Sequence, residues 1–195
     1  IHDDNNIGEC IDECLQTAMR MAEEDPNVFV PQQFINPANP QVHRSHTGKE
    51  ILEQVDGPIH GFCSGIGTGG TITGIGETLK AANPDMEIWA VEPEHAAILS
   101  GGSIGSHLQM GIGDGVIPDI LNQNIYQDIY IVKDEEAIRT AQELASKEGI
   151  MCGISSGTNV AAAIQLAKKL GEDKTVVTVL PDTAERYFST PLFED

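Results

Sequence analysis

The chain has 195 residues, of which 40% are hydrophobic, and it carries a formal net charge of −19. This length allows one sizeable core, so we expect one domain, or one domain with a fragment of another. The negative charge argues against nucleic acid or an anionic membrane as a partner, because both are bound through basic patches. No apolar run approaches the roughly 20 residues that cross a bilayer.

An amphipathic helix is predicted over residues 7–24, where apolar side chains recur at three- and four-residue spacing. The segment before it is polar and begins at Ile1 without Met, so we expect no signal peptide and interpret the chain as processed, truncated or partly observed. Cys10 and Cys14 lie four apart on this helix, where packing is favoured over a two-thiol metal site. The four cysteines form no CxxC pair, which fits a reducing cytoplasm.

Strands and helices alternate along the rest of the chain. A short strand is predicted at 28–30, followed by an irregular, proline-rich connection over 31–40. The further expected strands are 59–63, 87–92, 126–132 and 175–180, and the expected helices are a segment ending near 82, then 134–147 and 156–170. This order predicts an α/β fold with an open, mostly parallel twisted sheet and helices on both faces, and ligands at the carboxyl ends of its strands. The β-branched run 175–180 predicts a strand covered on both faces.

A glycine-rich loop, Ser64–Gly74, lies between a predicted strand and a predicted helix. Glycines let successive backbone N–H groups approach one anion, and the helix dipole adds to the attraction. The loop therefore predicts a phosphate site. Gly65, Gly67 and Gly70 also satisfy G-x-G-x-x-G, with Glu92 about 20 residues further on, so a nucleotide-binding Rossmann module is an alternative. A dinucleotide fingerprint should follow the first strand of its fold, whereas this loop starts well into the chain.

Three further motifs occur in order with the glycine loop: 31–40 (PQQFINPANP), 152–157 (CGISSG) and 180–190 (LPDTAERYFST). Together they resemble the cysteine synthase family, which belongs to the fold-type-II pyridoxal-phosphate enzymes with a tryptophan synthase β-like fold. The resemblance covers essentially the whole chain. It implies an incomplete fold, in which residues 1–35 are a remnant of the smaller domain and residues 36–195 are the larger cofactor-binding domain.

The resemblance assigns roles to individual residues. It implies that Gln33, Phe34 and Gly111 bind the substrate, and glutamine suits a carboxylate because its amide N–H donates without bringing a charge. Packing within an irregular loop is the alternative for Gln33 and Phe34. The cofactor-binding residues implied are Gly67, Thr68, Gly69, Gly70 and Thr71 around the phosphate, Ser155 against the pyridine nitrogen, and Pro181 and Asp182 near the ring. A helix N-cap is the alternative for Ser155, and a simple turn residue is the alternative for Asp182.

Asp114 stands in the loop Gly111–Gly115, where the resembled family commonly has a small residue. A carboxylate there could act as a general base on water or a thiol and shift the reaction from making cysteine towards cleaving it. A solvated turn residue is the alternative. His43, His46 and His107 have no spacing typical of a zinc site, so structural or surface roles are expected for them and no metal is predicted.

The resemblance implies a cysteine synthase that uses pyridoxal 5′-phosphate to convert O-acetyl-L-serine and sulfide into L-cysteine by β-replacement. A cysteine desulfhydrase and a cystathionine β-synthase-like enzyme are the alternatives within the family. The family's cofactor-bearing lysine lies in an N-terminal segment, and none of the seven lysines here matches its context, so we expect this chain alone to be inactive. The resemblance also implies a homodimer that can bind the C-terminal peptide of serine acetyltransferase, and a non-catalytic fragment retaining such docking is the remaining alternative.

Overall fold

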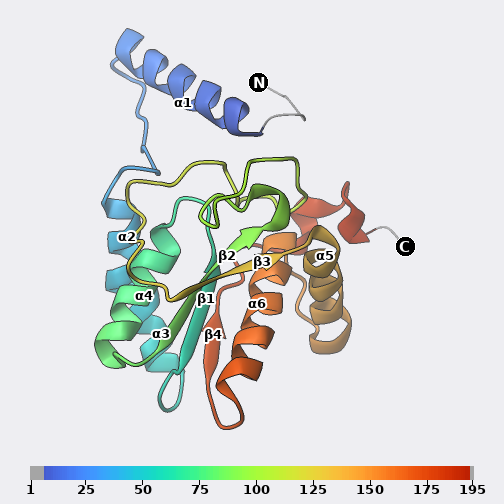
Figure 1. Ribbon diagram of the computed structural model, residues 1–195. Coiled ribbons are helices and arrows are strands. Elements are labelled where there is room, and N and C mark those ends of the chain that lie inside the picture. The colour runs from blue at the N-terminus through green and yellow to red at the C-terminus, as the bar shows by residue number, and fades with distance from the viewer. Residues whose placement is uncertain (1–6, 194–195) are drawn as a thin grey trace.

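The computed structural model describes residues 7–193, and a parallel four-stranded sheet forms its centre (Figure 1). The strands are β1 (Gly61–Gly65), β2 (Glu87–Pro93), β3 (Asp128–Val132) and β4 (Val176–Thr178), arranged in the order β3-β2-β1-β4. All three pairings are parallel. The predicted open parallel α/β sheet is therefore confirmed. Its strand order reverses between β1 and β4, the place where open sheets of this type bind ligands.

Helices cover both faces of the sheet because the buried strands present apolar side chains alternately to each side. Phe62 and Ile88 face a core completed by α4 (Gly70–Ala82), whereas Cys63 and Val91 face a core completed by α5 (Asp134–Glu143) and α6 (Ile154–Leu170). The helix pair α5 and α6 approaches closely at Gly157, where an added Cβ would lie 2.0 Å from the Ala137 carbonyl oxygen. Glycine is thus required there by contact between the helices.

The N-terminal helix α1 (Ile7–Glu24) stands away from the sheet, joined to it by an extended segment (Figure 1). The predicted strand at 28–30 is wrong: no strand forms there, because the segment has no neighbouring strand to pair with, and the Phe29 side chain is 83% exposed. After the proline-rich connection, α2 (Ala38–Val42), the π-helical turn His43–Thr47 and α3 (Gly48–Gln54) lie beside α4. Within 7–193, no helix has the length and apolar character needed to cross a membrane.

The remaining elements are short turns of 3-10 or π-helix at Glu94–Ala96, Leu144–Glu148, Ala184–Tyr187 and Pro191–Phe193. Most predicted boundaries hold to within a few residues, with β1 starting at Gly61 rather than at 59. Side chains of the last strand pack on both faces of the sheet, as predicted: Val176 packs against the core of α5 and α6, and Val177 packs against the core of α4. All three residues of β4, which lies at the edge of the sheet, are nevertheless only half-buried.

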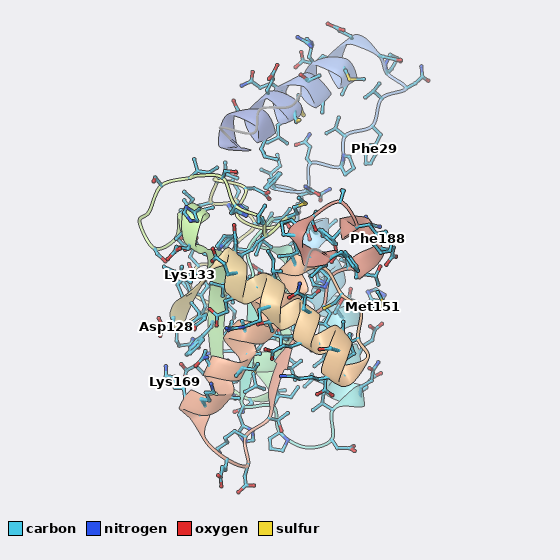
Figure 2. The ribbon with its side chains drawn as sticks, turned by 90° about the vertical axis from the view of Figure 1, so that its right-hand side faces the viewer. Phe29, Asp128, Lys133, Met151, Lys169 and Phe188 are labelled. Carbon is cyan, nitrogen blue, oxygen red and sulfur yellow. The ribbon has the colours of Figure 1, made fainter. Side chains whose placement is uncertain are left out.

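The amino end of the sheet is tied together by charged side chains. Lys169 on α6 lies 5.1 Å from the ring centre of Trp89 and forms ion pairs with Glu87 and, at 4.0 Å, with Asp128. Figure 2 shows Lys169 and Asp128 on the same side of the molecule. These pairs are solvent-exposed, so their contribution to the free energy of unfolding is small. This end of the sheet is remote from the strand ends described below.

Glu77 on α4 holds two segments together, and its substitution is predicted to destabilise the fold. Its carboxylate accepts hydrogen bonds from Arg44 and, at 2.8 Å, from Asn122. Burial alone would raise the pKa of Glu77, but the bonds from Arg44 and Asn122 and the Arg44 charge hold it below the ordinary 4.5. We expect Glu77→Gln to lower the free energy of unfolding by about 1 kcal/mol at pH 7.

The pH dependence of that loss follows from the sign of the shift. A carboxylate whose pKa is depressed in the folded state contributes stability above its unfolded pKa and loses it as the pH falls through the folded value. Urea unfolding of both proteins should therefore show a difference at pH 7 that shrinks below pH 4.5. A difference that stays constant across this range would contradict the ion pair as its source.

Candidate functional site

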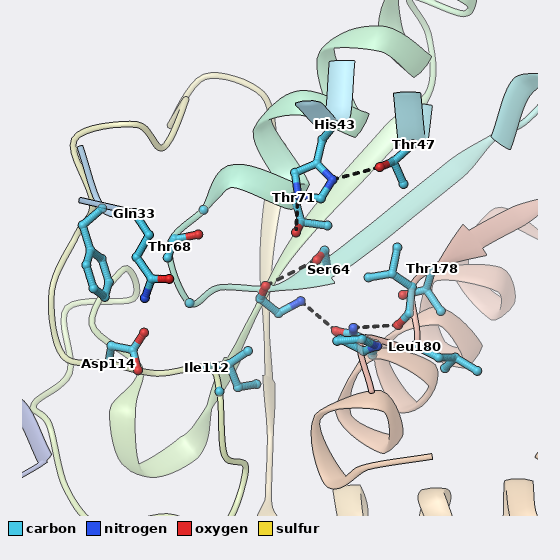
Figure 3. Close-up of a pocket in the computed structure, with 18 of the residues that line it drawn as sticks. Gln33, His43, Thr47, Ser64, Thr68, Thr71, Ile112, Asp114, Thr178 and Leu180 are labelled. Atoms are coloured by element: carbon cyan, nitrogen blue, oxygen red, sulfur yellow. Dashed lines mark hydrogen bonds between the residues drawn. The ribbon is translucent and has the colours of Figure 1, made fainter. Parts of the chain in front are cut away.

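A cavity of about 840 Å³ opens at the carboxyl ends of β1 and β4, where the strand order reverses (Figure 3). Its floor is formed by Ser64 and Gly65 at the end of β1 and by the segment Thr178–Pro181 that leaves β4. The glycine-rich loop, the segment at 33–34, the loop at 111–114 and helix α1 form its walls. The cavity thus occupies the position at which the sequence predicts a ligand site.

The glycine-rich loop presents backbone N–H groups to this cavity. Gly67, Thr68, Gly69 and Thr71 line it, and within residues 7–193 none of their N–H groups has a hydrogen-bond acceptor in the protein. Gly69 has φ +76° and is the N-cap of α4, so the positive end of the helix dipole lies at the same place. Free amide donors at a helix N-terminus are the usual cradle of a phosphate group.

Close contacts set the shape of this cradle. An added Cβ at Gly67 would lie 2.7 Å from the Gly111 carbonyl oxygen, and one at Gly70 would lie 1.9 Å from Asn39 Oδ1. Gly70 is not itself a lining residue; it admits Asn39, whose Nδ2 donates to Thr68 Oγ1 at 2.9 Å and to the Gln33 carbonyl oxygen at 2.9 Å. Because Thr68 Oγ1 accepts this bond, its own O–H remains available to an anion.

His43 stands behind the second threonine of the loop, and it lines the cavity. Its Nδ1 lies 3.0 Å from Thr47 Oγ1, and its Nε2 lies 3.4 Å from Thr71 Oγ1 (Figure 3). If Nδ1 accepts from Thr47, then Nε2 carries the hydrogen and donates to Thr71, which leaves the Thr71 O–H free for a phosphate oxygen. The expectation of a purely structural or surface role is therefore incomplete for His43.

Burial lowers the pKa of His43 below the ordinary 6.5, so we predict that this imidazole stays neutral at pH 7. A group whose folded-state pKa is depressed is protonated more readily in the unfolded chain, so folding loses stability as the pH falls below 6.5. NMR titration of the His43 ring should give a midpoint below the ordinary 6.5. A His43 midpoint at or above 6.5 would contradict this environment.

The substrate-binding residues implied by the sequence lie beside the phosphate loop, because Asn39 Nδ2 donates to both the Gln33 carbonyl oxygen and Thr68 Oγ1. Gln33 and Phe34 both line the cavity, with Phe34 buried and Gln33 exposed to it. Figure 3 shows the Gln33 amide on the same side of the cavity as the Asp114 carboxylate. Gln32 precedes them with φ +55°, a left-handed conformation that is costly for a residue with a side chain. The backbone at 32–34 is thus held in an unusual turn beside the cavity.

Asp114 lines the cavity next to Gly111. Burial raises the pKa of its carboxyl above the ordinary 3.8, and the nearby His107 acts in the opposite direction. Its Oδ2 lies 3.5 Å from the position of a Cβ added to Gly67, which places the carboxylate beside the phosphate loop. A half-buried carboxylate with a raised pKa is suited to accept and release a proton inside the cavity. Asp114 remains partly exposed, so its role as a base stays a prediction.

Asn159 is a cavity residue that the sequence analysis missed. This buried side chain accepts a hydrogen bond from Gly65 N at 2.7 Å and donates one to the Val179 carbonyl oxygen at 2.8 Å. It therefore joins the ends of β1 and β4 from helix α6 and forms part of the cavity floor. Cys63, directly below, is no candidate nucleophile, since burial raises the pKa of its thiol to about 12.

Three further predicted cofactor residues lie at the start of α6 and beside it. Pro181 lines the cavity, whereas Ser155 and Asp182 do not. Ser155 is 4% exposed in the first turn of α6, whose N-cap is Gly153, so the N-cap alternative for Ser155 is wrong. Asp182 accepts a hydrogen bond from Tyr187, while its Oδ1 is buried without a partner in the described part of the chain. A role of either residue against a pyridine ring stays a prediction.

Glu92 does not serve a nucleotide. It is 4% exposed, and its carboxylate accepts hydrogen bonds from Leu99 N at 2.7 Å, Ser100 N at 3.1 Å and Ser100 Oγ at 2.9 Å. A ribose hydroxyl would have to displace these internal bonds, which weakens the dinucleotide alternative. Between residues 7 and 193 the loop follows β1, the first strand of this range.

No metal ligand set accompanies the cavity. Among the described residues, no three His, Cys, Asp or Glu side chains gather closely enough to hold a metal ion. The helix-packing expectation for the cysteines of α1 is wrong for Cys14, which is exposed, and the Cys10 side chain lies outside the described residues. The site therefore consists of the glycine-rich loop, the Gln33 side chain and the Asp114 carboxylate around one cavity.

Comparison with known proteins gives a consistent result. The family described as pyridoxal-phosphate dependent enzyme matches residues 4–182. A cysteine synthase of Staphylococcus aureus (strain N315) is 49% identical over 185 residues, which are 93% of this chain and 60% of that protein. The chain thus spans about 60% of the length of this curated relative.

Two solved structures are similar in fold and sequence. The cysteine synthase of Entamoeba histolytica has a TM-score of 0.87 and 39% identity, over 93% of this chain and 54% of that chain. A hydrogen sulfide-producing enzyme of Fusobacterium nucleatum has a TM-score of 0.87 and 37% identity, over 92% of this chain and 55% of that chain. The similarity extends over the sheet and the cavity described above.

Proposed function

Because the chain belongs to the family of pyridoxal-phosphate dependent enzymes, we propose that the protein makes L-cysteine from O-acetyl-L-serine and sulfide by β-replacement. The observation that carries the proposal is one cavity that is lined both by the glycine-rich loop, through Gly67, Thr68, Gly69 and Thr71, and by Gln33. The first offers amide and hydroxyl donors for the cofactor phosphate, and the second offers a neutral donor for a substrate carboxylate.

The cavity fits pyridoxal phosphate. Added Cβ atoms at Gly67 and Gly70 would collide with the walls of the cradle, so the loop backbone itself forms the anion-binding surface. When bound, the cofactor supplies a ring that accepts electron density from the substrate's α-carbon. Ser155 is proposed to face the ring nitrogen and Pro181 to pack against the ring; a neutral hydroxyl leaves that nitrogen largely unprotonated, which favours loss of a β-substituent over transamination.

The direct test is cysteine formation. The complete protein loaded with pyridoxal phosphate is expected to produce L-cysteine from O-acetyl-L-serine and sulfide, and Gln33→Leu in it is expected to raise the KM for O-acetyl-L-serine with little change in cofactor affinity. Gln41→Leu, an exposed glutamine on α2 outside the cavity, is the matched control. A complete protein that binds the cofactor but forms no cysteine would overturn the proposal.

We further propose that residues 1–195 alone do not turn over substrate. No lysine lines the cavity in the described part of the chain, so no amine there is placed to hold the cofactor covalently or to move the α-proton. The division into a remnant of a smaller domain (1–35) and a larger domain (36–195) is supported by α1, which stands away from the sheet (Figure 1). Intact mass together with cofactor absorbance and turnover of the same sample tests this proposal, and turnover by a chain of 20.9 kDa would contradict it.

A second candidate function is cysteine desulfhydration, and Asp114 favours it. Its carboxylate lines the cavity and has a pKa raised by burial, so it is placed to take a proton from water or a thiol. One relative of similar fold is named as a hydrogen sulfide-producing enzyme. The same cavity would then release sulfide from cysteine rather than consume it.

Asp114→Asn is predicted to separate the two functions. The amide cannot accept a proton at neutral pH, so we expect sulfide release from L-cysteine to fall at least about tenfold relative to cysteine synthesis. Asp119→Asn, an exposed carboxylate a few residues further on, is the control. An unchanged ratio of the two activities in Asp114→Asn would remove Asp114 as the base and leave synthesis as the single candidate.

Family membership also suggests the protein's partners and its cellular compartment. We propose a homodimer that accepts the C-terminal peptide of serine acetyltransferase in the open cavity, and a cytoplasmic location. The free thiols of Cys63 and Cys152 support a reducing compartment. Sedimentation of the loaded protein and competition of the peptide with O-acetyl-L-serine test these assignments.

A further inference from the structure

We propose that Gln109 is a positioning residue that fixes the cavity loop Gly111–Gly115 and thereby sets the affinity for the amino-acid substrate. Gln109 itself does not line the cavity. The proposal rests on the proposed function for the identity of the substrate, but the geometry on which it depends is independent of that identity.

The Gln109 side chain is fully buried, and every part of its amide is engaged. Its Nε2 donates to the Val132 carbonyl oxygen at 3.0 Å and to Asp134 Oδ1 at 2.8 Å, and its Oε1 accepts from Thr158 Oγ1 at 2.8 Å. One side chain thus joins the end of β3, the first residue of α5 and the middle of α6. A buried amide whose donors and acceptor are all paired allows one orientation, because any other leaves polar groups unpaired.

The backbone on either side of Gln109 is held by the same group of residues. Asp134 Oδ2 accepts from Leu108 N at 2.8 Å. Gln109 N donates to His107 Nδ1 at 3.2 Å, so the ring's hydrogen resides on Nε2, which donates to the Gly113 carbonyl oxygen at 3.3 Å. The His107 ring therefore ties the buried part of the loop directly to its cavity part.

The clamped loop contacts the phosphate cradle. Gly113 N donates to the Ile66 carbonyl oxygen at 2.9 Å, and the Gly111 carbonyl oxygen lies 2.7 Å from the position of a Cβ on Gly67. A shift of this loop would move Gly111 and Asp114 relative to the ligand, whereas the amide donors of the cradle belong to a different segment. We therefore expect Gln109 to influence the amino-acid end of the cavity more than the phosphate end.

An apolar side chain of similar size would fill the same space without the hydrogen bonds that hold the loop in place. Gln109→Leu removes three hydrogen bonds and leaves Asp134 Oδ1 and Thr158 Oγ1 without their present partner. Gln127→Leu is the matched control: Gln127 accepts from Ile88 N at 2.8 Å and donates to the Ile125 carbonyl oxygen at 3.3 Å, near the amino end of β2. Both variants lose a glutamine that bonds backbone groups, but only the first lies behind the cavity loop.

The experiment combines amide hydrogen exchange with substrate kinetics on the complete protein loaded with pyridoxal phosphate. In Gln109→Leu, exchange over 108–115 is expected to speed up about tenfold relative to β2, with a rise of similar size in the KM for O-acetyl-L-serine and less than a twofold change in cofactor affinity. Gln127→Leu is expected to leave the loop's exchange and the KM unchanged.

Two outcomes would overturn the proposal. One is unchanged exchange of the loop in Gln109→Leu, and the other is exchange that rises equally in the loop, β1 and α6, which indicates general destabilisation. If the unaltered complete protein forms no cysteine, the proposed function fails, but the comparison of exchange rates still decides whether Gln109 positions the loop.

Discussion

Gly70→Ala is expected to abolish most of the affinity for pyridoxal phosphate, by roughly two orders of magnitude or more. The new methyl group would lie 1.9 Å from Asn39 Oδ1 and 2.9 Å from Asn39 Nδ2, so Asn39 must leave its place. Its departure breaks the 2.9 Å bond to Thr68 Oγ1 and the 2.9 Å bond to the Gln33 carbonyl oxygen. One methyl group thereby disturbs both the phosphate loop and the segment proposed to bind the substrate carboxylate.

Fluorescence titration measures the affinity for pyridoxal phosphate and for pyridoxal, which lacks the phosphate. Comparing the two affinities shows whether the substitution acts on binding of the phosphate group. The variant should lose affinity for the phosphorylated ligand while its weak affinity for pyridoxal changes little. Gly101→Ala is the control: it has φ +80° and no neighbour within 4 Å of an added Cβ, so it strains the backbone away from the cavity. Equal losses for both ligands in Gly70→Ala would mean that the loop does not hold the phosphate.

The parallel sheet could be predicted because its signals are local. The β-branched and apolar composition of β2 and β3 follows from burial of their side chains, and β1 is marked by the glycine-rich turn that comes directly after it. Val28–Val30 has the same strand-forming composition, yet it is no strand, since a strand requires a neighbour to accept its hydrogen bonds. The half-burial of β4 was missed for a related reason: sequence composition does not reveal which strand lies at the edge.

The cavity could be predicted in part. Gly67, Thr68 and Gly69 were found because a glycine-rich turn before a helix has few purposes other than binding an anion. His43 and Asn159 were missed because their roles depend on contacts with residues 28 and 94 positions away in the chain. One signal was present for Asn159, since an asparagine in an alanine-rich helix that packs on a sheet must find partners for its amide.

The two ends of the cavity differ in how they are built, and this difference bears on specificity. The phosphate cradle is formed by backbone groups, so side-chain changes alter it only through collisions such as that of Gly70 with Asn39. The amino-acid end is formed by side chains and by a loop clamped from behind through Gln109. Changes of reaction are therefore expected to arise at Asp114 and its loop, with the cofactor end unchanged.

Asn159→Leu is expected to lower the free energy of unfolding by about 2 kcal/mol, because it leaves two half-buried backbone groups, Gly65 N and the Val179 carbonyl oxygen, without their present partner. Urea unfolding monitored by the fluorescence of Trp89 measures this loss. Asn83→Leu is the control: Asn83 Nδ2 donates to the Ile59 carbonyl oxygen, and its Oδ1 accepts from Asp85 N at 3.3 Å, an exposed N–H that water can bind instead, so its replacement should cost about half as much. Equal losses in the two variants would contradict the bridging role of Asn159.

Asn159→Asp distinguishes the two bonds of this bridge through their pH dependence. A carboxylate oxygen can still accept from Gly65 N, but the second oxygen would face the Val179 carbonyl oxygen, which also only accepts. The fold therefore favours the protonated carboxyl, which can donate, and raises its pKa above the unfolded value of about 3.9. Stability from a raised pKa is fully present below the unfolded pKa and is lost as the pH rises through the folded one. The loss of unfolding free energy in Asn159→Asp, relative to the unaltered protein, should thus be smallest in acid and grow towards pH 7. The loss in Asn159→Leu should not vary with pH. A loss that is independent of pH in both variants would show that the bond to Val179 contributes little.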